Sequence, residues 1–412
     1  MEGHAAPREL TADGAMGQPP AAPRDRADRP YVLAVARAED DEDVRRLLRS
    51  SAFGNDVSVS LEREPDSRLA GSIEGDVHDA IVARHRVSGE TAAVASRSVR
   101  VAYLNGAPLR LGYFGQLRID RRFSRRRGLL DAGFEFCRMM HLESGSSAPR
   151  LYLASVVADN EPARRLLARH APGSGWPQFE PVDTLVSLAI PVERRRSRQA
   201  PPGVAIRRGS PELLDQIVAC LERTGRRTQF CPRWTRADLL SPIRARGLTL
   251  DDFVVAMRAD RVIGCAACWD QRAFKQVVVR GYSPKLSRLR PVINFVAPLT
   301  GTPALPAVGA RVECAYLSHV AVDQDLHESG EAVDPSSVLR ALVHEALAIG
   351  RAKGAAYVVL GLSARSPWLP DLRRSLPHRS YDSILYAAFW ADGEPLAASL
   401  DNRPSHPELA IL

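Results

Sequence analysis

Five arginines crowd a short stretch between an apolar run and a glycine. The run Gln116-Leu117-Arg118-Ile119 has the composition of a strand, and the arginines stand at Arg121, Arg122, Arg125, Arg126 and Arg127. Gly128 then opens a segment whose apolar residues recur at the spacing of an amphipathic helix. A turn of this kind directs free backbone N–H groups and the positive end of the helix dipole toward one point. The pattern predicts a site for phosphate or pyrophosphate, and the alternative is a solvated basic loop.

The residues around Gly128 resemble motif A of the GNAT superfamily, the GCN5-related acyl-CoA-dependent N-acyltransferases. That motif consists of Arg or Gln, any two residues, Gly, any one residue, and then Gly or Ala. In this chain residues 125–130 read Arg-Arg-Arg-Gly-Leu-Leu. The run therefore matches the motif except at its last position, Leu130. A strand-like run, 151–156, and Asn160-Glu161-Pro162-Ala163 resemble motif B. The resemblance covers residues 30–190. It implies an acyl-CoA site formed by Leu117, Arg118, Ile119, Arg125, Arg126, Arg127, Gly128, Leu129, Leu130 and Asn160.

Asn160 also has a purely structural interpretation. Asn is a favoured helix N-cap, and Pro162 follows in the first turn of the predicted helix. The residue therefore fits motif B and ordinary capping equally well.

The resemblance also implies a mechanism, in which an amine attacks the thioester directly. A backbone N–H near Leu117–Ile119 would polarise the carbonyl, and an acid would protonate the leaving thiolate. Many members use a tyrosine seven residues after the motif B asparagine, where this chain has Leu167. The catalytic acid and base are therefore not assigned. Tyr113, Tyr152 and His170 are candidates by proximity in sequence, and a structural role is the alternative for each.

Composition restricts the remaining function classes. The chain has 412 residues, 56 basic and 48 acidic, for a net charge of +8. This excess of basic residues favours anionic partners. The sequence has no aromatic-rich basic stripe of the kind that would indicate a nucleic-acid-binding surface. Six cysteines show no disulfide spacing, which is typical of a reducing cytoplasm. The single CxxC at Cys265 and Cys268 lies in an apolar run, so we expect buried thiols and no metal site.

Neither the N-terminus nor the longest uncharged stretch predicts a membrane segment. Residues 1–29 lack periodicity and an apolar core, so we expect a disordered tail without a signal peptide. The uncharged residues 292–310 include three prolines and two glycines, which favours a loop or lid over a membrane-spanning helix.

The order of predicted elements indicates two tandem copies of one α/β fold, each a mixed, mostly antiparallel sheet flanked by helices. The first copy, residues 30–192, contains a hairpin at Asn105-Gly106, and a charged linker at 193–203 follows it. The second copy, residues 204–412, has an acidic run at 323–334 where the first has arginines. Five carboxylates there would repel a pyrophosphate, so the second copy is interpreted as degenerate.

Three functions remain open at this point. The first is an N-acyltransferase that uses acetyl-CoA or another acyl-CoA and a primary amine of a small molecule or peptide, with no nucleic acid and no membrane as partner. The second is a non-catalytic acyl-CoA sensor, consistent with the missing acid and with Leu130. The third, a nucleic-acid-binding protein, depends on charge alone. The oligomeric state is not predicted.

Overall fold

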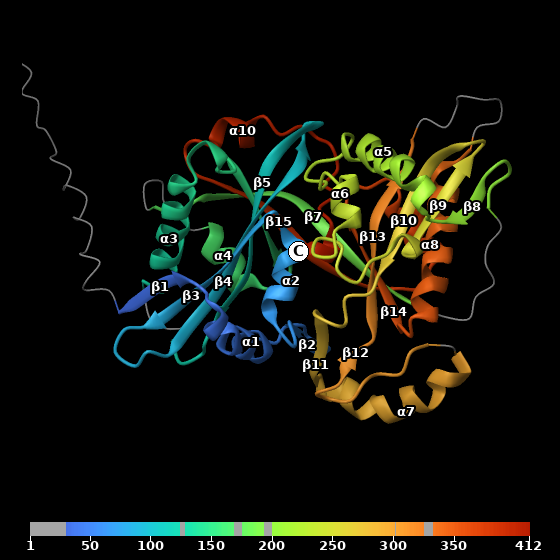
Figure 1. The fold of residues 1–412 in the computed structure, drawn as a ribbon. Coiled ribbons are helices and arrows are strands. Elements are labelled where there is room, and N and C mark those ends of the chain that lie inside the picture. Colours follow the sequence, from blue (N-terminus) through green and yellow to red (C-terminus); the bar gives the residue numbers. More distant parts are fainter. Residues whose placement is uncertain (1–29, 124–127, 169–174, 193–199, 301, 325–332) are drawn as a thin grey trace, which may run out of the picture.

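The main feature of the structure, a computed structural model, is a mixed sheet of twelve strands that runs through the whole molecule (Figure 1). The structure describes residues 30–123, 128–168, 175–192, 200–300, 302–324 and 333–412. The strand order is β1-β3-β4-β5-β6-β15-β7-β14-β13-β10-β9-β8. The strands are β1 (Tyr31–Val35), β2 (Val57–Glu62), β3 (Val77–His85), β4 (Thr91–Leu104), β5 (Ala107–Ile119), β6 (Leu151–Val157), β7 (Gln178–Pro191), β8 (Ala205–Arg208), β9 (Phe253–Arg258), β10 (Arg261–Trp269), β11 (Gln276–Tyr282), β12 (Arg311–Val312), β13 (Cys314–Val322), β14 (Tyr357–Ser363) and β15 (Arg379–Phe389).

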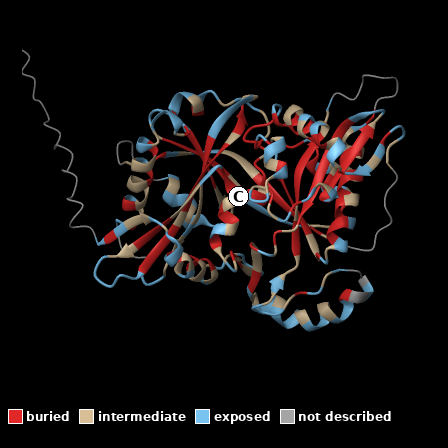
Figure 2. Cartoon of the chain, viewed as in Figure 1, coloured by how far each residue is buried: buried red, intermediate tan, exposed pale blue. Residues whose placement is uncertain are grey.

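Helices cover both faces of this sheet, and buried residues are concentrated in its central strands (Figure 2). The α-helices are α1 (Asp41–Ser50), α2 (Ser67–Glu74), α3 (Leu129–Glu143), α4 (Glu161–Ala168), α5 (Leu214–Gly225), α6 (Arg236–Leu240), α7 (Pro284–Thr300), α8 (Pro335–Ala352), α9 (Leu369–Ser375) and α10 (Glu394–Ala398). Short 3₁₀ helices are η2 (Ala38–Asp40), η3 (Gly145–Ser147), η4 (Pro211–Leu213), η5 (Leu250–Asp252) and η6 (Leu409–Ile411).

The predicted hairpin at Asn105-Gly106 is confirmed, and its turn has the expected chemistry. Asn105 and Gly106 both have positive φ, at 51° and 83°, as the tight turn between β4 and β5 requires. The sequence analysis assigned no element to the stretch that contains β2 and α2. β2 alternates apolar and polar residues, as a strand does, but it pairs outside the main sheet.

The last strands of the two halves are exchanged. β15, from the second half, lies between β6 and β7, and pairs antiparallel with both. β7, from the first half, pairs antiparallel with β14 of the second half. The two sheets predicted from the sequence are therefore joined into one, with both exchanged strands at its centre.

A second sheet, β12-β11-β2, also joins the halves (Figure 1). β2 follows α1 in the first half and pairs with β11 of the second. α7 packs beside β11, so the expectation of a loop across 292–310 is wrong for residues up to Thr300. Pro284 lies in the first turn of α7, where a missing N–H costs nothing. No helix in the described ranges is long and apolar enough to span a bilayer.

The turns and helix ends of the second half are formed by the same kinds of residues as those of the first half. The hairpin β9–β10 turns at Ala259, whose φ is 50°. α8 begins after Asp334, whose carboxylate accepts the backbone N–H groups of Ser336 and Ser337. Gly354, with φ of 74°, follows the end of this helix.

Candidate functional site

A bulge in β5 marks the centre of the candidate site. Between the pairs Val94–Arg118 and Ser96–Gly115, β5 contains one more residue than β4 does. The extra residue falls at Gln116, whose φ is 53°. Such a bulge turns backbone polar groups out of the strand ladder. The bulge thus lies in the segment where the sequence resemblance implied an N–H for polarising a carbonyl.

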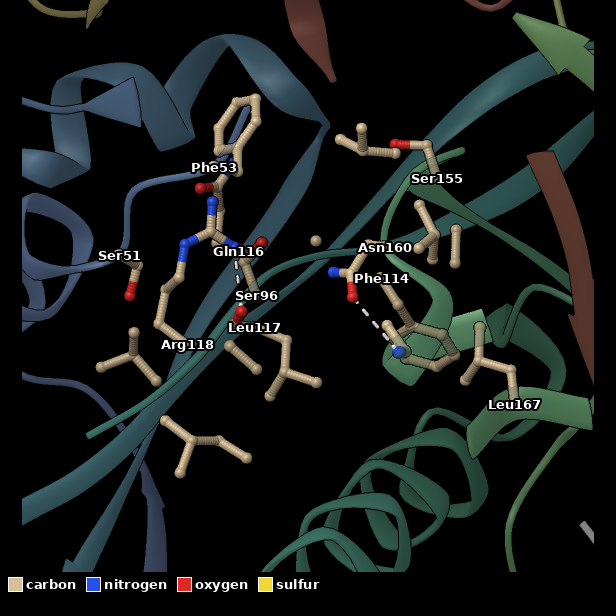
Figure 3. A pocket seen from close by; sticks show the side chains of 18 of the residues that line it. Ser51, Phe53, Ser96, Phe114, Gln116, Leu117, Arg118, Ser155, Asn160 and Leu167 are labelled. Carbon is tan, nitrogen blue, oxygen red and sulfur yellow. Dashed lines mark hydrogen bonds between the residues drawn. The ribbon is translucent and has the colours of Figure 1, made fainter. Parts of the chain in front are cut away.

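β5 and β6 part next to this bulge. They pair in parallel only from Leu111–Leu151 to Phe114–Ala154, although β5 continues to Ile119 and β6 to Val157. The gap opens into a cavity of about 820 Å³ (Figure 3). Ligand sites in proteins commonly have roughly 300–1,000 Å³. The separated strands therefore form a space large enough for an extended ligand.

The two faces of β5 look toward different helices. Arg118 pairs with Val94, which packs with Val44, Leu47 and Leu48 of α1. Ile119 packs instead with Leu129 of α3. Because side chains alternate along a strand, Arg118 and Ile119 point to opposite faces of the sheet.

Seven of the residues predicted to bind acyl-CoA lie around this gap. Six line the cavity, namely Leu117, Arg118, Ile119, Leu129, Leu130 and Asn160. Gly128 immediately precedes α3. Arg125, Arg126 and Arg127 lie outside the described residues, so their arrangement is not part of this geometry.

Gly128 is the N-cap of α3 and has a φ of 89°. Among the described residues, no heavy atom would lie within 4 Å of a Cβ added there. The glycine is therefore required by backbone conformation and not by crowding within the chain. The open space beside it adjoins the N-terminus of α3, where free N–H groups favour an anion.

Asn160 performs the capping role that its sequence context also predicted. Its Oδ1 accepts the Ala163 N–H at 3.2 Å, one turn into α4. The same residue lines the cavity, so capping and ligand contact are compatible at this position.

The structure separates the candidate acids. Tyr113 lines the cavity, and its hydroxyl is 2.8 Å from the Ser155 Oγ across the parting strands. Burial raises the pKa of Tyr113, so this phenol stays protonated at neutral pH. Tyr152 lies away from the cavity lining, with its hydroxyl 3.1 Å from His141 Nδ1. His170 lies outside the described residues.

Sequence reasoning missed several parts of the cavity wall. The loop after α1 contributes residues 51–55, and the exchanged strand β15 contributes Tyr381 and Ser383. Leu409 and Leu412 line it from the end of the described chain. No local motif marks these residues, because only the strand exchange brings the second half to the cavity of the first.

The second half contains a matching bulge, but a backbone N–H in that bulge already donates a hydrogen bond to another part of the chain. Between the pairs Cys265–Ala321 and Ala267–Ser318, β13 has one residue more than β10, and His319 has a φ of 54°. The His319 N–H donates to the Glu408 carboxylate at 2.7 Å. A Cβ added to Gly361 of β14 would lie 2.8 Å from that of Leu409. The segment around Glu408 therefore fills the second half's counterpart of the site.

The acidic run of the second half is only partly described. Asp323 pairs with Arg223 at 2.9 Å and with Arg261 at 3.3 Å. Residues 325–332 lie outside the described ranges. Within those ranges no group of three His, Cys, Asp or Glu side chains could hold a metal ion. The six cysteines are free and buried, which confirms the structural interpretation of Cys265 and Cys268.

Comparisons with solved structures show that the chain has the GNAT fold. A GCN5-related N-acetyltransferase from Sphaerobacter thermophilus superposes with a TM-score of 0.54 and 14% identity, over 87% of this chain and 95% of that one. Saccharomyces cerevisiae N-myristoyltransferase with bound myristoyl-CoA gives a TM-score of 0.56 and 13% identity, over 90% and 87%. The expected fold is thereby confirmed across both halves. No protein-family model and no curated protein sequence matches the chain.

Proposed function

We propose that this protein is an acyl-CoA-dependent N-acyltransferase that transfers an acyl group, acetyl in the simplest case, to a primary amine of a small molecule or peptide. The observation that carries the proposal is the bulge at Gln116, beside the cavity between β5 and β6. The fold supports it, since solved neighbours include an acetyltransferase and a myristoyltransferase. The first half would bind the donor, because the corresponding bulge of the second half is occupied by Glu408.

In this reaction the amine nitrogen attacks the thioester carbonyl carbon. The new C–N bond forms, the C–S bond breaks, the amine loses a proton, and the thiolate gains one to leave as free CoA. Backbone groups at 116–119 would stabilise the oxyanion that develops on the carbonyl. The N-terminus of α3, with Gly128 and the arginines at 125–127, would hold the pyrophosphate.

Tyr113 is the described residue best placed to protonate the leaving thiolate. It lines the cavity at the point where β5 and β6 part, and its pKa is raised by burial. A protonated phenol held in this position suits a general acid. The sequence position that the family uses, Leu167, also lines the cavity but has no proton to give.

We also propose that residues 30–192 and 204–412 are two GNAT-like domains joined by the linker 193–203, and that the protein acts in the cytoplasm. The free cysteines fit a reducing compartment. These two domains are proposed as units of evolution and not as units that fold separately, because the exchange of β7 and β15 makes each half depend on the other.

Thiol release decides between catalysis and sensing. The protein is incubated with acetyl-CoA or longer acyl-CoA donors and a panel of primary amines, and free CoA is measured. Amine-dependent release supports the transferase. If calorimetry shows acyl-CoA binding but no amine accelerates release, the protein is the non-catalytic acyl-CoA sensor.

A further inference from the structure

One cation lies in a cavity that is otherwise mostly apolar. Among the described residues that line it, Arg118 is the only Lys or Arg, and Asp159 is the only Asp or Glu. Asp159 already accepts a hydrogen bond from the Asn55 amide at 3.2 Å. The Asp159 carboxylate is thus hydrogen-bonded to a loop residue and does not form an ion pair with Arg118.

Arg118 has no counter-ion among the described residues. Its one hydrogen bond there runs from Nη1 to the Leu117 carbonyl oxygen at 2.9 Å (Figure 3). Desolvation, with a smaller contribution from nearby Arg63, lowers its pKa, but a guanidinium remains charged at neutral pH. Arg118 is half-buried, and holding a partly desolvated cation without an anion carries a cost in free energy. Such a group is typical of a position that a ligand anion completes.

Two more polar atoms beside Arg118 lack partners. The Gln116 Oε1 and the Ser96 Oγ are both buried, and neither forms a hydrogen bond within the described chain. Both residues line the cavity, and Ser96 pairs with Gly115 next to the bulge. Most buried polar groups in proteins are satisfied, so two unsatisfied oxygens near an arginine that has no described counter-ion indicate a missing polar ligand.

We propose that the acceptor is an amino acid, whose carboxylate binds Arg118 and Ser96 while its amine donates to the Gln116 side-chain oxygen. This inference rests on the proposed transferase function. Arg118 offers several N–H donors and Ser96 an O–H, which together suit a carboxylate. Ser96 pairs with Gly115, which precedes Gln116, and Arg118 follows the same bulge, so the carboxylate and the attacking amine would bind within one short part of the cavity wall. That proximity selects α-amino acids over peptide lysines and simple amines.

A CoA phosphate is another possible source of the anion, but the position of Arg118 argues against it. The Arg118 side chain shares a face with Val94 and α1, whereas α3 packs on the opposite face through Leu129. The pyrophosphate proposed at the start of α3 would therefore lie across the sheet. Measuring acyl-CoA affinity in an Arg118 variant distinguishes the two sources.

The kinetic test compares each of the twenty amino acids with its amide in the thiol-release assay. Wild type should prefer the free acid. Arg118→Gln should raise KM for the acid at least tenfold and abolish the preference for the acid over its amide. Arg118→Lys should restore part of the preference. The matched control is Arg110→Gln, on the same strand but exposed to solvent, which should behave as wild type.

A binding test makes the inference independent of turnover. N-acetyl amino acids and N-acetyl amino acid amides are titrated into the CoA-bound protein by calorimetry, and only the acids should lose affinity in Arg118→Gln. Equal affinity of wild type for acids and amides, or a weaker acetyl-CoA complex in the variant, would overturn the proposal. Thiol release with only carboxylate-free amines would also overturn it while leaving the transferase function intact. Absence of release with every amine would instead refute the transferase function.

Discussion

The His319 backbone N–H donates a 2.7 Å hydrogen bond to the Glu408 carboxylate. His319 lies in the β13 bulge, and Gln116 lies in the corresponding bulge of β5. At Gln116 the neighbouring space is a cavity, and at His319 it is filled by the chain itself. The two halves therefore share a β-bulge at the same place in the fold, and they differ in what the bulge contacts.

This difference predicts a binding stoichiometry. We expect one acyl-CoA per chain, because the second bulge already contacts a carboxylate and η6 packs against β13. Isothermal titration with acetyl-CoA measures the number of sites directly. Two equivalent sites would show that the Glu408 segment does not close the second half.

Glu408 also predicts how stability changes with pH. Burial raises the pKa of Glu408 from 4.5 to about 7, although Arg100 and Lys275 oppose the shift. The folded state therefore binds more protons than the unfolded state between pH 4.5 and 7, and stability falls as pH rises through this window. At about 1.4 kcal/mol per pKa unit, the loss is on the order of 3 kcal/mol.

Glu408→Gln should remove this dependence. Relative to wild type, the variant should gain melting temperature steadily from pH 4.5 to 7. Glu180→Gln changes an exposed carboxyl and serves as the control, with a constant offset expected. A constant offset for Glu408→Gln as well would mean that Glu408 titrates normally.

Gly128→Val should weaken acetyl-CoA binding more than it destabilises the fold. A β-branched residue at a φ of 89° costs about 1–2 kcal/mol, and its side chain would occupy the open space beside the α3 N-terminus. Gly145→Val is the matched control, because Gly145 also has positive φ and open surroundings but lies in η3 and not at the start of α3. Calorimetry and thermal melts of both variants check the prediction. Equal loss of affinity in both would make Gly128 a conformational glycine only.

Tyr113→Phe should reduce kcat roughly 10²-fold with little effect on the Kd for acyl-CoA, since it removes the proposed proton donor. Tyr152→Phe provides the comparison. It removes the contact to His141 and should cost about 1 kcal/mol of stability without lowering kcat. Steady-state kinetics and melts of both variants decide between the tyrosines, and an unaffected kcat in Tyr113→Phe eliminates it as the acid.

Residues 30–192 and 204–412 should not fold when expressed separately. Without β15, the edges of β6 and β7 are exposed, and unpaired edges of this kind promote aggregation. Co-expression should restore a soluble complex that elutes at the size of the intact chain. A soluble, folded 30–192 fragment on its own would show that the exchange of β7 and β15 is dispensable.

The sequence alone determined the local features of this protein. Asn105-Gly106 specified the β4–β5 turn because both residues tolerate positive φ, and Asp334 specified the start of α8 because its carboxylate caps free N–H groups. The glycine at Gly128 could be interpreted from the sequence for the same reason, because its role depends on its own backbone conformation. The family resemblance correctly implied the fold.

Only the tertiary structure decided what surrounds these local features. The exchange of β7 and β15 brings Tyr381 to the cavity of the first half, and the Glu408 carboxylate reaches His319 across 89 residues. That Arg118 has no counter-ion among the described residues is likewise visible only once its neighbours are placed. Strand pairing and burial depend on residues far apart in the chain, and no local pattern of residue types records which distant segments will meet.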